Sequence, residues 1–182
     1  RGVAVLGATG SVGRNALDVI ARFPRRFRVT ALCAGTNARA LAALARIHRP
    51  DVVCLRDGDA ASLRKELPRG TRIVFGEQGM TEAACARNAD IVLAAASGIS
   101  SLRPVIAAAE PGKRIALANK ELLVMAGKFL TATKLRESFT LNFESLFLDM
   151  FTEVPQGGGE RVEAPRPVER FAIDADSEDE PA

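Results

Sequence analysis

Short apolar runs alternate regularly with amphipathic stretches over the first two thirds of this sequence. The apolar runs occupy residues 3–6, 29–33, 52–55, 72–75, 91–95 and 114–117. The stretches with helical spacing occupy residues 11–22, 37–48, 59–67, 80–87, 101–109 and 120–135. Apolar strands that alternate with amphipathic helices are typical of a parallel sheet covered on both faces. Because such crossovers are right-handed, we predict an α/β fold with a doubly wound parallel sheet.

The alternation ends near residue 135 and divides the sequence into three segments. Residues 1–131 form the predicted doubly wound domain, and residues 132–151 hold the end of the last helix and an apolar segment without a clear register. Residues 152–182 combine three consecutive glycines, four prolines and an acidic end. That composition buries too little apolar surface to offset its ordering entropy, so we predict a disordered acidic C-terminal tail.

Charge is distributed unevenly along the chain. Residues 1–151 carry 22 Lys and Arg against 13 Asp and Glu, whereas residues 152–182 carry 3 against 9. The arginines of the basic part are scattered, and the chain has no Tyr or Trp to stack on bases, so we expect no nucleic-acid partner. No uninterrupted apolar run approaches the length of about 18 residues that a membrane span needs, so no membrane partner is expected. A phosphorylated small molecule suits the basic part better.

The three cysteines and the first residue bear on the cellular setting. Cys33, Cys54 and Cys85 fit no metal-ligand or redox spacing, and each lies in an apolar or Ala-rich run. We predict that all three are small buried residues of a reducing compartment. The sequence runs from Arg1 directly into the first apolar run, so we expect no signal peptide, and the missing Met suggests processing or a fragment.

A glycine-rich loop follows the first predicted strand and opens the first predicted helix. Its sequence is Gly7-Ala8-Thr9-Gly10-Ser11-Val12-Gly13. In this context Gly7 permits a tight turn, Gly10 lets a pyrophosphate approach the backbone, and Gly13 lets helix and strand pack closely. The backbone N–H groups of residues 9–13 then face the ligand at the positive end of the helix, and the hydroxyls of Thr9 and Ser11 can add hydrogen bonds. The loop predicts a Rossmann-type dinucleotide site.

The end of the second predicted strand indicates which dinucleotide binds. An NAD enzyme usually places Asp or Glu there to hold the ribose diol. This sequence has Gly35-Thr36-Asn37 instead, followed by Arg39, and no carboxylate. Nothing there repels a 2′-phosphate, and Thr36, Asn37, the Gly35 backbone and Arg39 can bind it. We therefore predict NADP(H), while noting that Asn37 can also act as a helix N-cap.

A second polar cluster, Asn119-Lys120-Glu121, follows the sixth predicted strand. Polar residues at the carboxyl ends of strands lie where doubly wound folds bind ligands. Asn119 can hold the nicotinamide ribose or amide, Lys120 offers a charge to an anionic substrate, and Glu121 offers an acceptor beside it. The alternative is a capped helix that begins with a solvated Lys–Glu pair.

Four stretches together resemble 1-deoxy-D-xylulose 5-phosphate reductoisomerase. They are Gly7-Ala8-Thr9-Gly10-Ser11-Val12-Gly13, Asn15-Ala16-Leu17-Asp18-Val19-Ile20, Ala34-Gly35-Thr36-Asn37 and Ile115-Ala116-Leu117-Ala118-Asn119-Lys120-Glu121. The resemblance extends over residues 1 to about 130. It implies a homodimeric enzyme of the bacterial cytoplasm or plastid stroma. With NADPH and Mg or Mn, such an enzyme rearranges and reduces a sugar phosphate, deoxyxylulose phosphate, to methylerythritol phosphate for isoprenoid synthesis.

The resemblance also implies roles for individual residues. Thr9, Gly10, Ser11 and Val12 would hold the pyrophosphate and the adjoining ribose. Gly35, Thr36 and Asn37 would hold the adenosine end. Asn119 and Glu121 would face the nicotinamide half, and Lys120 would contact the substrate.

The sequence departs from the family beyond this region. The family carries Asp-Ser-Glu-His, which supplies metal ligands, where this chain has Phe143-Glu144-Ser145-Leu146-Phe147. A Leu–Phe pair cannot ligate a hard divalent cation, so we find no metal ligands. The sole histidine, His48, is expected at the solvated end of a helix and not as a catalytic acid. Two hypotheses remain: the NADPH-binding portion of an incomplete reductoisomerase, or a stand-alone, degenerate NADP(H)-binding module without activity.

Overall fold

The computed structural model describes residues 1–58, 60–119, 121–122 and 139–140 of the chain. Two sequence predictions fall outside these residues: Lys120 as a substrate contact, and the helix over 120–135 beyond its start. The predicted tail over 152–182 and most of the segment 132–151 also lie outside them.

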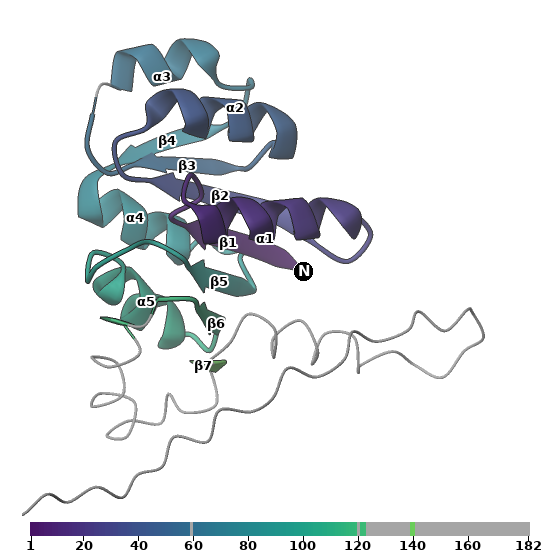
Figure 1. Cartoon of the computed structure of the whole chain (residues 1–182), viewed down its shortest axis with the longest axis vertical. Coiled ribbons are helices and arrows are strands. Elements are labelled where there is room, and N and C mark those ends of the chain that lie inside the picture. Colours follow the sequence, from purple (N-terminus) through teal and green to yellow (C-terminus); the bar gives the residue numbers. More distant parts are fainter. Residues whose placement is uncertain (59, 120, 123–138, 141–182) are drawn as a thin grey trace, which may run out of the picture.

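Strands and helices alternate through the described chain. They are β1 (Gly2–Leu6), α1 (Ser11–Arg22), β2 (Arg28–Ala34), α2 (Ala38–His48), β3 (Val52–Leu55), α3 (Ala60–Glu66), β4 (Arg72–Phe75), α4 (Gly76–Ala84), β5 (Ile91–Ala94), α5 (Leu102–Ala109), β6 (Arg114–Leu117) and β7 (Phe139–Thr140). The strands form one parallel sheet in the order β4-β3-β2-β1-β5-β6-β7 (Figure 1). The predicted α/β, doubly wound, Rossmann-type fold is confirmed.

The structure differs from the predicted elements at one helix and at one additional strand. Helix α4 begins at Gly76 and ends at Ala84, whereas the sequence pattern suggested residues 80–87. Gly76 has a φ of +66°, a backbone conformation that suits glycine, and the helix begins there directly after β4. In addition, Phe139–Thr140 pairs with β6 as a seventh strand, although no strand register was expected there.

The core has two layers, one on each face of the sheet. Helices α1, α2 and α3 pack on the first face through Leu17, Leu41 and Leu63, which meet alternate strand residues. Helices α4 and α5 cover the second face through Met80 and Val105. The continuous burial of β1, β3 and β5 explains why the strands read as unbroken apolar runs.

The side on which successive strands are added to the sheet changes at the central strand β1. The connections from β1 to β4 move to one side of the sheet, and β5, β6 and β7 extend it on the other. Because β1 pairs with both β2 and β5, the loops after β1 and β5 diverge at this switch point. No helix within the described residues is long and apolar enough to cross a membrane.

Candidate functional site

The glycine loop lies between the carboxyl end of β1 and the first turn of α1. The backbone N–H groups of Gly7 and Ala8 both donate to the carbonyl of Cys33 in β2, at 2.9 and 2.8 Å. The Gly10 N–H donates back to the Gly7 carbonyl at 3.1 Å, which closes the turn. The loop is therefore fixed to the sheet by its own backbone.

The three glycines of the loop differ in how tightly the fold constrains them. A Cβ on Gly7 would lie 2.5 Å from the Ala96 backbone nitrogen, and the φ of Gly7 is +88°. A Cβ on Gly13 would lie 2.3 Å from the Gly7 carbonyl oxygen. The contact of a Cβ on Gly10 would be 3.4 Å, which is ordinary van der Waals contact. The fold thus requires glycine at 7 and 13, whereas at Gly10, the N-cap of α1, the surrounding atoms leave room for a Cβ.

The first turn of α1 is suited to an anion. Gly10 is the N-cap residue and no side chain caps the helix, while the first turn has no acidic residue. Ser11 and Val12 are exposed, and Thr9 is half-buried. The partial positive charge of the helix N-terminus is therefore presented to solvent at the loop, as pyrophosphate binding requires. This geometry fits the phosphate group of the predicted dinucleotide.

The predicted adenosine residues lie at the carboxyl end of β2, beside this loop. The Asn37 side chain accepts a hydrogen bond from the Ala40 backbone nitrogen at 3.0 Å, so the predicted N-cap of α2 is confirmed. The Ala38 N–H donates to the Thr36 carbonyl at 2.9 Å. Thr36 and Asn37 are exposed and Gly35 is half-buried, so these polar groups are accessible to a ligand.

Sequence reasoning missed two residues that the structure brings to the same place. Arg56 and Asp57 follow β3, and the Asp57 N–H donates to the Gly35 carbonyl at 3.0 Å. The Arg56 Nη2 lies 3.7 Å from the position of a Cβ on Gly35. A usable signal was present, because neighbouring parallel strands end at the same edge and Arg56 directly follows a buried strand.

Asn119 and Glu121 hold the loop that follows β5. The Asn119 Nδ2 donates to the carbonyls of Ala96 and Gly98 at 2.6 and 2.9 Å, and its Oδ1 accepts from the Glu121 N–H at 2.8 Å. The Glu121 Oε2 accepts from the Gly98 N–H at 2.6 Å. These contacts tie the ends of β5 and β6 together at the switch point.

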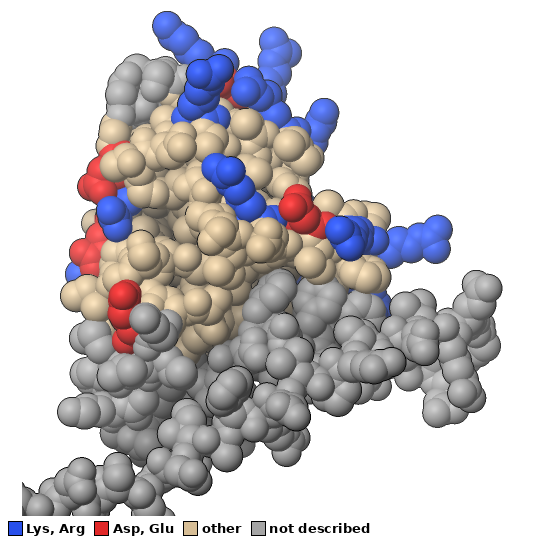
Figure 2. Space-filling model, viewed as in Figure 1, with Lys and Arg blue, Asp and Glu red and all other residues tan. Residues whose placement is uncertain are grey.

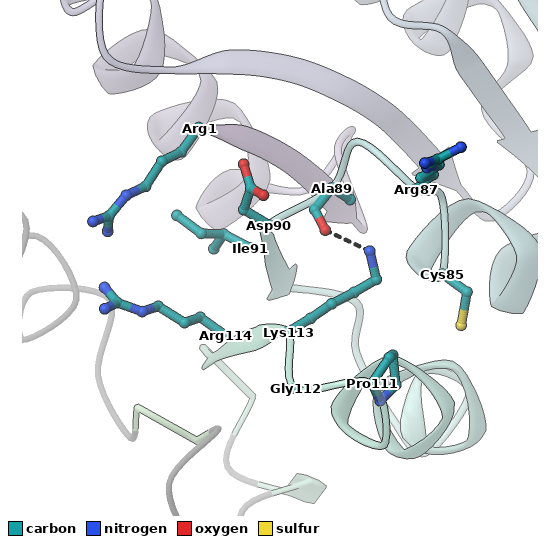
Figure 3. A pocket seen from close by; sticks show the side chains of 10 residues that line it. All are labelled: Arg1, Cys85, Arg87, Ala89, Asp90, Ile91, Pro111, Gly112, Lys113 and Arg114. Carbon is teal, nitrogen blue, oxygen red and sulfur yellow. Dashed lines mark hydrogen bonds between the residues drawn. The ribbon is translucent and has the colours of Figure 1, made fainter.

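The described part of the chain also has a hollow of about 770 Å³ at the opposite edge of the sheet, near the starts of β5 and β6 (Figure 3). Lys113 crosses it and donates to the carbonyls of Ala86 and Ala89. Burial lowers the pKa of Lys113, while Cys85 and Asp90 act in the other direction. Because this hollow has no glycine loop and no helix N-terminus, it does not resemble a dinucleotide site.

The cysteines agree only partly with the prediction. Cys33 and Cys54 are fully buried and are partners across β2 and β3, and their hydrogen bond and burial raise the pKa of Cys33. Cys85 is half-buried. It is the C-cap residue of α4, because that helix ends at Ala84 and not at residue 87 as expected. Within residues 1–58, 60–119, 121–122 and 139–140, no group of three His, Cys, Asp or Glu could hold a metal. The segment 143–147 lies outside these residues.

Comparison with known proteins identifies relatives of this arrangement. The family model of 1-deoxy-D-xylulose 5-phosphate reductoisomerase matches residues 3–127. The reductoisomerase of Moorella thermoacetica is 48% identical over 130 residues, which are 70% of this chain and 34% of that protein. The reductoisomerase of Ralstonia nicotianae is 43% identical over 159 residues, or 85% of this chain and 40% of that protein. The chain thus spans between a third and two fifths of the length of these curated relatives.

Solved structures show the same similarity. The reductoisomerase from Zymomonas mobilis in complex with NADPH has a TM-score of 0.69 and 36% identity, over 78% of this chain and 38% of that one. A second structure, in complex with NADPH, fosmidomycin and magnesium, has a TM-score of 0.69 and 38% identity, over 77% of this chain and 35% of that one.

Proposed function

Because the chain belongs to the 1-deoxy-D-xylulose 5-phosphate reductoisomerase family, we propose that its doubly wound domain is the NADPH-binding part of such an enzyme. The observation that carries this proposal is Gly10. It is the N-cap of a helix whose N-terminus no side chain caps, and Ser11 is exposed beside it, so the backbone N–H groups of the first turn are open to a phosphate.

The proposed binding mode assigns a part of the cofactor to each loop. Thr9, Gly10, Ser11 and Val12 bind the pyrophosphate with backbone N–H groups and hydroxyls. The loop that ends β2 binds the adenosine end. Asn119 and Glu121 act at the nicotinamide half by holding the loop that follows β5 close to β6.

The proposed reaction is the isomerisation and reduction of 1-deoxy-D-xylulose 5-phosphate to 2-C-methyl-D-erythritol 4-phosphate. NADPH supplies the hydride of the reduction when it is bound. This chain's contribution is to bind and orient that cofactor at the switch point, with Lys120 proposed as the substrate contact. A divalent Mg or Mn ion belongs to the proposed complete enzyme, and no described residue of this chain is assigned to it.

Binding of NADPH to the 182-residue chain tests the proposal most directly. Calorimetric titration should show binding of NADPH to the wild type, and Gly10→Ala should abolish it while costing no more than about 1 kcal/mol of stability, the loss of a glycine N-cap. The matched control is Gly70→Ala, which strains a backbone position with φ +88° away from the site. We expect that control to cost about 1–2 kcal/mol of stability and to leave NADPH binding intact. Undiminished binding by Gly10→Ala would contradict the proposed site.

A turnover assay addresses the two hypotheses that the sequence left open. With deoxyxylulose phosphate, NADPH and Mn, we expect no measurable turnover by this chain, because it spans only about a third of a reductoisomerase. Turnover comparable with that of a full-length relative would show that these residues suffice for catalysis.

A further inference from the structure

Arg56 and Asp57 are built into the carboxyl edge of the sheet beside the loop that ends β2. The Arg56 N–H donates to the Ala34 carbonyl at 2.9 Å, and the Asp57 N–H donates to the Gly35 carbonyl at 3.0 Å. These two bonds extend the pairing of β3 with β2 by one step past the strands. The backbone that carries Arg56 therefore has a fixed position relative to Gly35.

The guanidinium of Arg56 is also held in place. Its Nε donates to the Asp57 Oδ2 at 2.7 Å, and its Nη2 lies 3.7 Å from where a Cβ on Gly35 would be. This distance is that of ordinary van der Waals contact, so the guanidinium lies directly beside the backbone of the β2 loop. Asp57 takes one of the five N–H donors of the guanidinium, and the side chain keeps 37% of its surface exposed.

We propose that Arg56 binds the 2′-phosphate of NADPH and thereby sets the preference for NADPH over NADH. This inference rests on the proposed function, since it concerns the adenosine end of the same site. A guanidinium offers paired N–H donors that match two phosphate oxygens, and the charge assists both bonds. Gly35, Thr36 and Asn37 carry no charge, so Arg56 supplies the positive charge that a phosphate dianion needs.

Arg39 and Asp57 are two other charged residues near this loop, and each offers an alternative to the proposed role of Arg56. Arg39 is exposed on the first turn of α2, and the contacts of the described residues show no partner that orients it as Asp57 orients Arg56. Asp57 is a carboxylate, and carboxylates at this edge bind the ribose diol in NAD enzymes. Its bond to Arg56 offsets its charge, which makes the pair compatible with a phosphate.

Arg56→Gln tests the inference by separating the two cofactors. Affinities for NADPH and NADH are measured by calorimetry on the 182-residue chain and its variants. We expect Arg56→Gln to weaken NADPH binding by about 10- to 100-fold, the loss of charge-assisted bonds to one phosphate. NADH, which has no 2′-phosphate, should change by less than threefold. Arg22→Gln, exposed in the last turn of α1 and away from the carboxyl edge of the sheet, is the matched control and should change neither.

Further variants make the outcomes distinguishable. Asp57→Asn keeps an oxygen that can accept from the Arg56 Nε but removes the negative charge, so NADPH binding should be retained or tightened. If the wild type binds NADPH and Arg56→Gln keeps the same NADPH-to-NADH ratio, the inference is wrong while the proposed function stands. If the wild type prefers NADH and Asp57→Asn loses that preference, Asp57 binds the ribose and the role of Arg56 is overturned. If the wild type binds neither nucleotide, the proposed function itself fails.

Discussion

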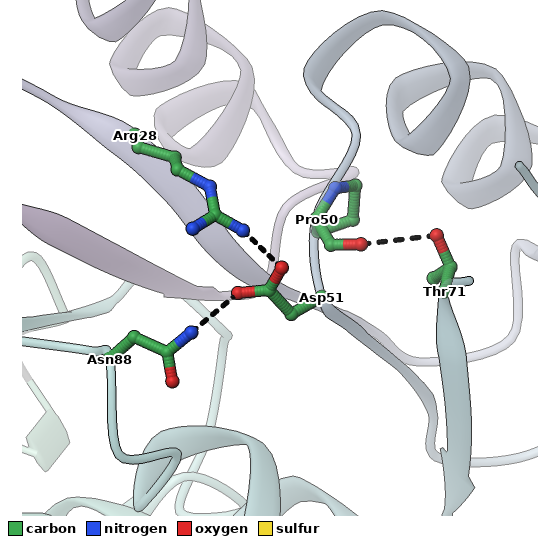
Figure 4. A network of polar contacts seen from close by, with 5 residues as sticks. All are labelled: Arg28, Pro50, Asp51, Thr71 and Asn88. Carbon is green, nitrogen blue, oxygen red and sulfur yellow. Dashed lines mark hydrogen bonds and ion pairs between the residues drawn. The ribbon is translucent and has the colours of Figure 1, made fainter. Parts of the chain in front are cut away.

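Backbone hydrogen bonds join neighbouring strand ends at both edges of the sheet, but the two edges use their polar side chains differently. At the amino edge, polar side chains add connections between strand ends: Asp51 pairs with Arg28 and accepts from the Asn88 Nδ2 at 2.8 Å, and the Thr71 hydroxyl donates to the Pro50 carbonyl at 3.1 Å (Figure 4). At the carboxyl edge, the loops after β1, β2 and β3 are joined by backbone hydrogen bonds alone, and side chains join only the loops after β5 and β6, through Asn119 and Glu121, among the described residues. The chain starts at the amino edge, marked N in Figure 1.

Because of this difference, we expect residues at the amino edge to contribute to stability and residues at the carboxyl edge to contribute to ligand binding. At the amino edge, the polar groups of the connecting side chains are already hydrogen-bonded within the protein. Backbone bonds at the carboxyl edge fix the loops while leaving the hydroxyls of Thr36 and Ser11 and the N-terminus of α1 available to a ligand. Changes at the amino edge should therefore alter stability without altering NADPH affinity, and changes at the carboxyl edge should alter affinity.

The surface charge follows a separate pattern. Figure 2 shows Lys and Arg gathered over the end of the molecule where α2 and α3 lie in Figure 1. The residues there include Arg39, Arg46, Arg64 and Lys65, and one of them, Arg46, pairs with Glu66 at 3.3 Å. A positive field on the side of the sheet where we propose that the adenosine end binds favours the approach of a polyanionic cofactor, and added salt should weaken that attraction.

Gly13→Ala is expected to have the largest effect on the carboxyl edge. Its Cβ would lie 2.3 Å from the Gly7 carbonyl oxygen and 2.8 Å from the Ala8 Cα, so the backbone of the loop must move. We expect a loss of about 3 kcal/mol in the free energy of unfolding together with loss of NADPH binding. Urea unfolding and calorimetry measure the two effects. A stable variant that binds NADPH normally would show that the tight approach of α1 to β1 is not needed.

Asn119→Ala should have the next largest effect, because three hydrogen bonds are lost at once. Its removal leaves the Ala96 and Gly98 carbonyls without their donor, and we expect a cost of about 1–2 kcal/mol. Hydrogen exchange at the Gly98 amide should accelerate and NADPH affinity should fall. Asn88→Ala, which removes an amide from the amino edge, is the matched control and should leave NADPH affinity unchanged.

Asp51→Ala probes the amino edge with a smaller expected effect. The ion pair with Arg28 is exposed, with 57% and 38% of the two side-chain surfaces accessible, so solvent screens it. We expect a loss of about 0.5–1 kcal/mol, and the loss should shrink in high salt. NADPH affinity should not change. A tenfold loss of affinity would break the proposed separation of the two edges.

Much of the fold follows from local patterns in the sequence. The predicted bounds of β3, β4, β6 and α1 match the observed ones, because in each case an apolar run or a helical period is unbroken. Helix α4 was misplaced because its first turn, Gly76-Glu77-Gln78-Gly79, has no apolar residue to reveal the period. The strand Phe139–Thr140 was missed because two residues are too short to show alternation.

The candidate site was only partly predictable, for a physical reason. Gly13 could be identified because its role depends on Gly7 and Ala8, which are close in sequence, whereas the glycine motif identified Gly7 without showing its close contact with the distant Ala96. The place of Arg56 directly after a buried strand is visible in the sequence, but its nearness to Gly35 depends on the pairing of β2 with β3, which no local pattern contains. For the same reason the sequence suggested that Asn119 faces the cofactor, but could not show that its amide holds the Ala96–Gly98 loop.

The pH dependence of stability tests the comparison of the two edges through the smallest expected effect. His48 ends α2, and burial lowers its pKa from the ordinary value, while Asp18 acts in the other direction. The folded state therefore binds fewer protons than the unfolded state as pH falls through 6.5, so stability decreases there. In His48→Gln this part of the decrease should be absent. Urea unfolding at pH 7.5 and pH 5.5 measures it: the free energy of unfolding should differ less between the two pH values in the variant than in the wild type. Because His48 is remote from the glycine loop, the NADPH affinity of wild type and variant should agree at pH 7.5. An equal pH response in both proteins would assign the decrease to other groups, and a changed affinity would mean that the end of α2 is coupled to the site.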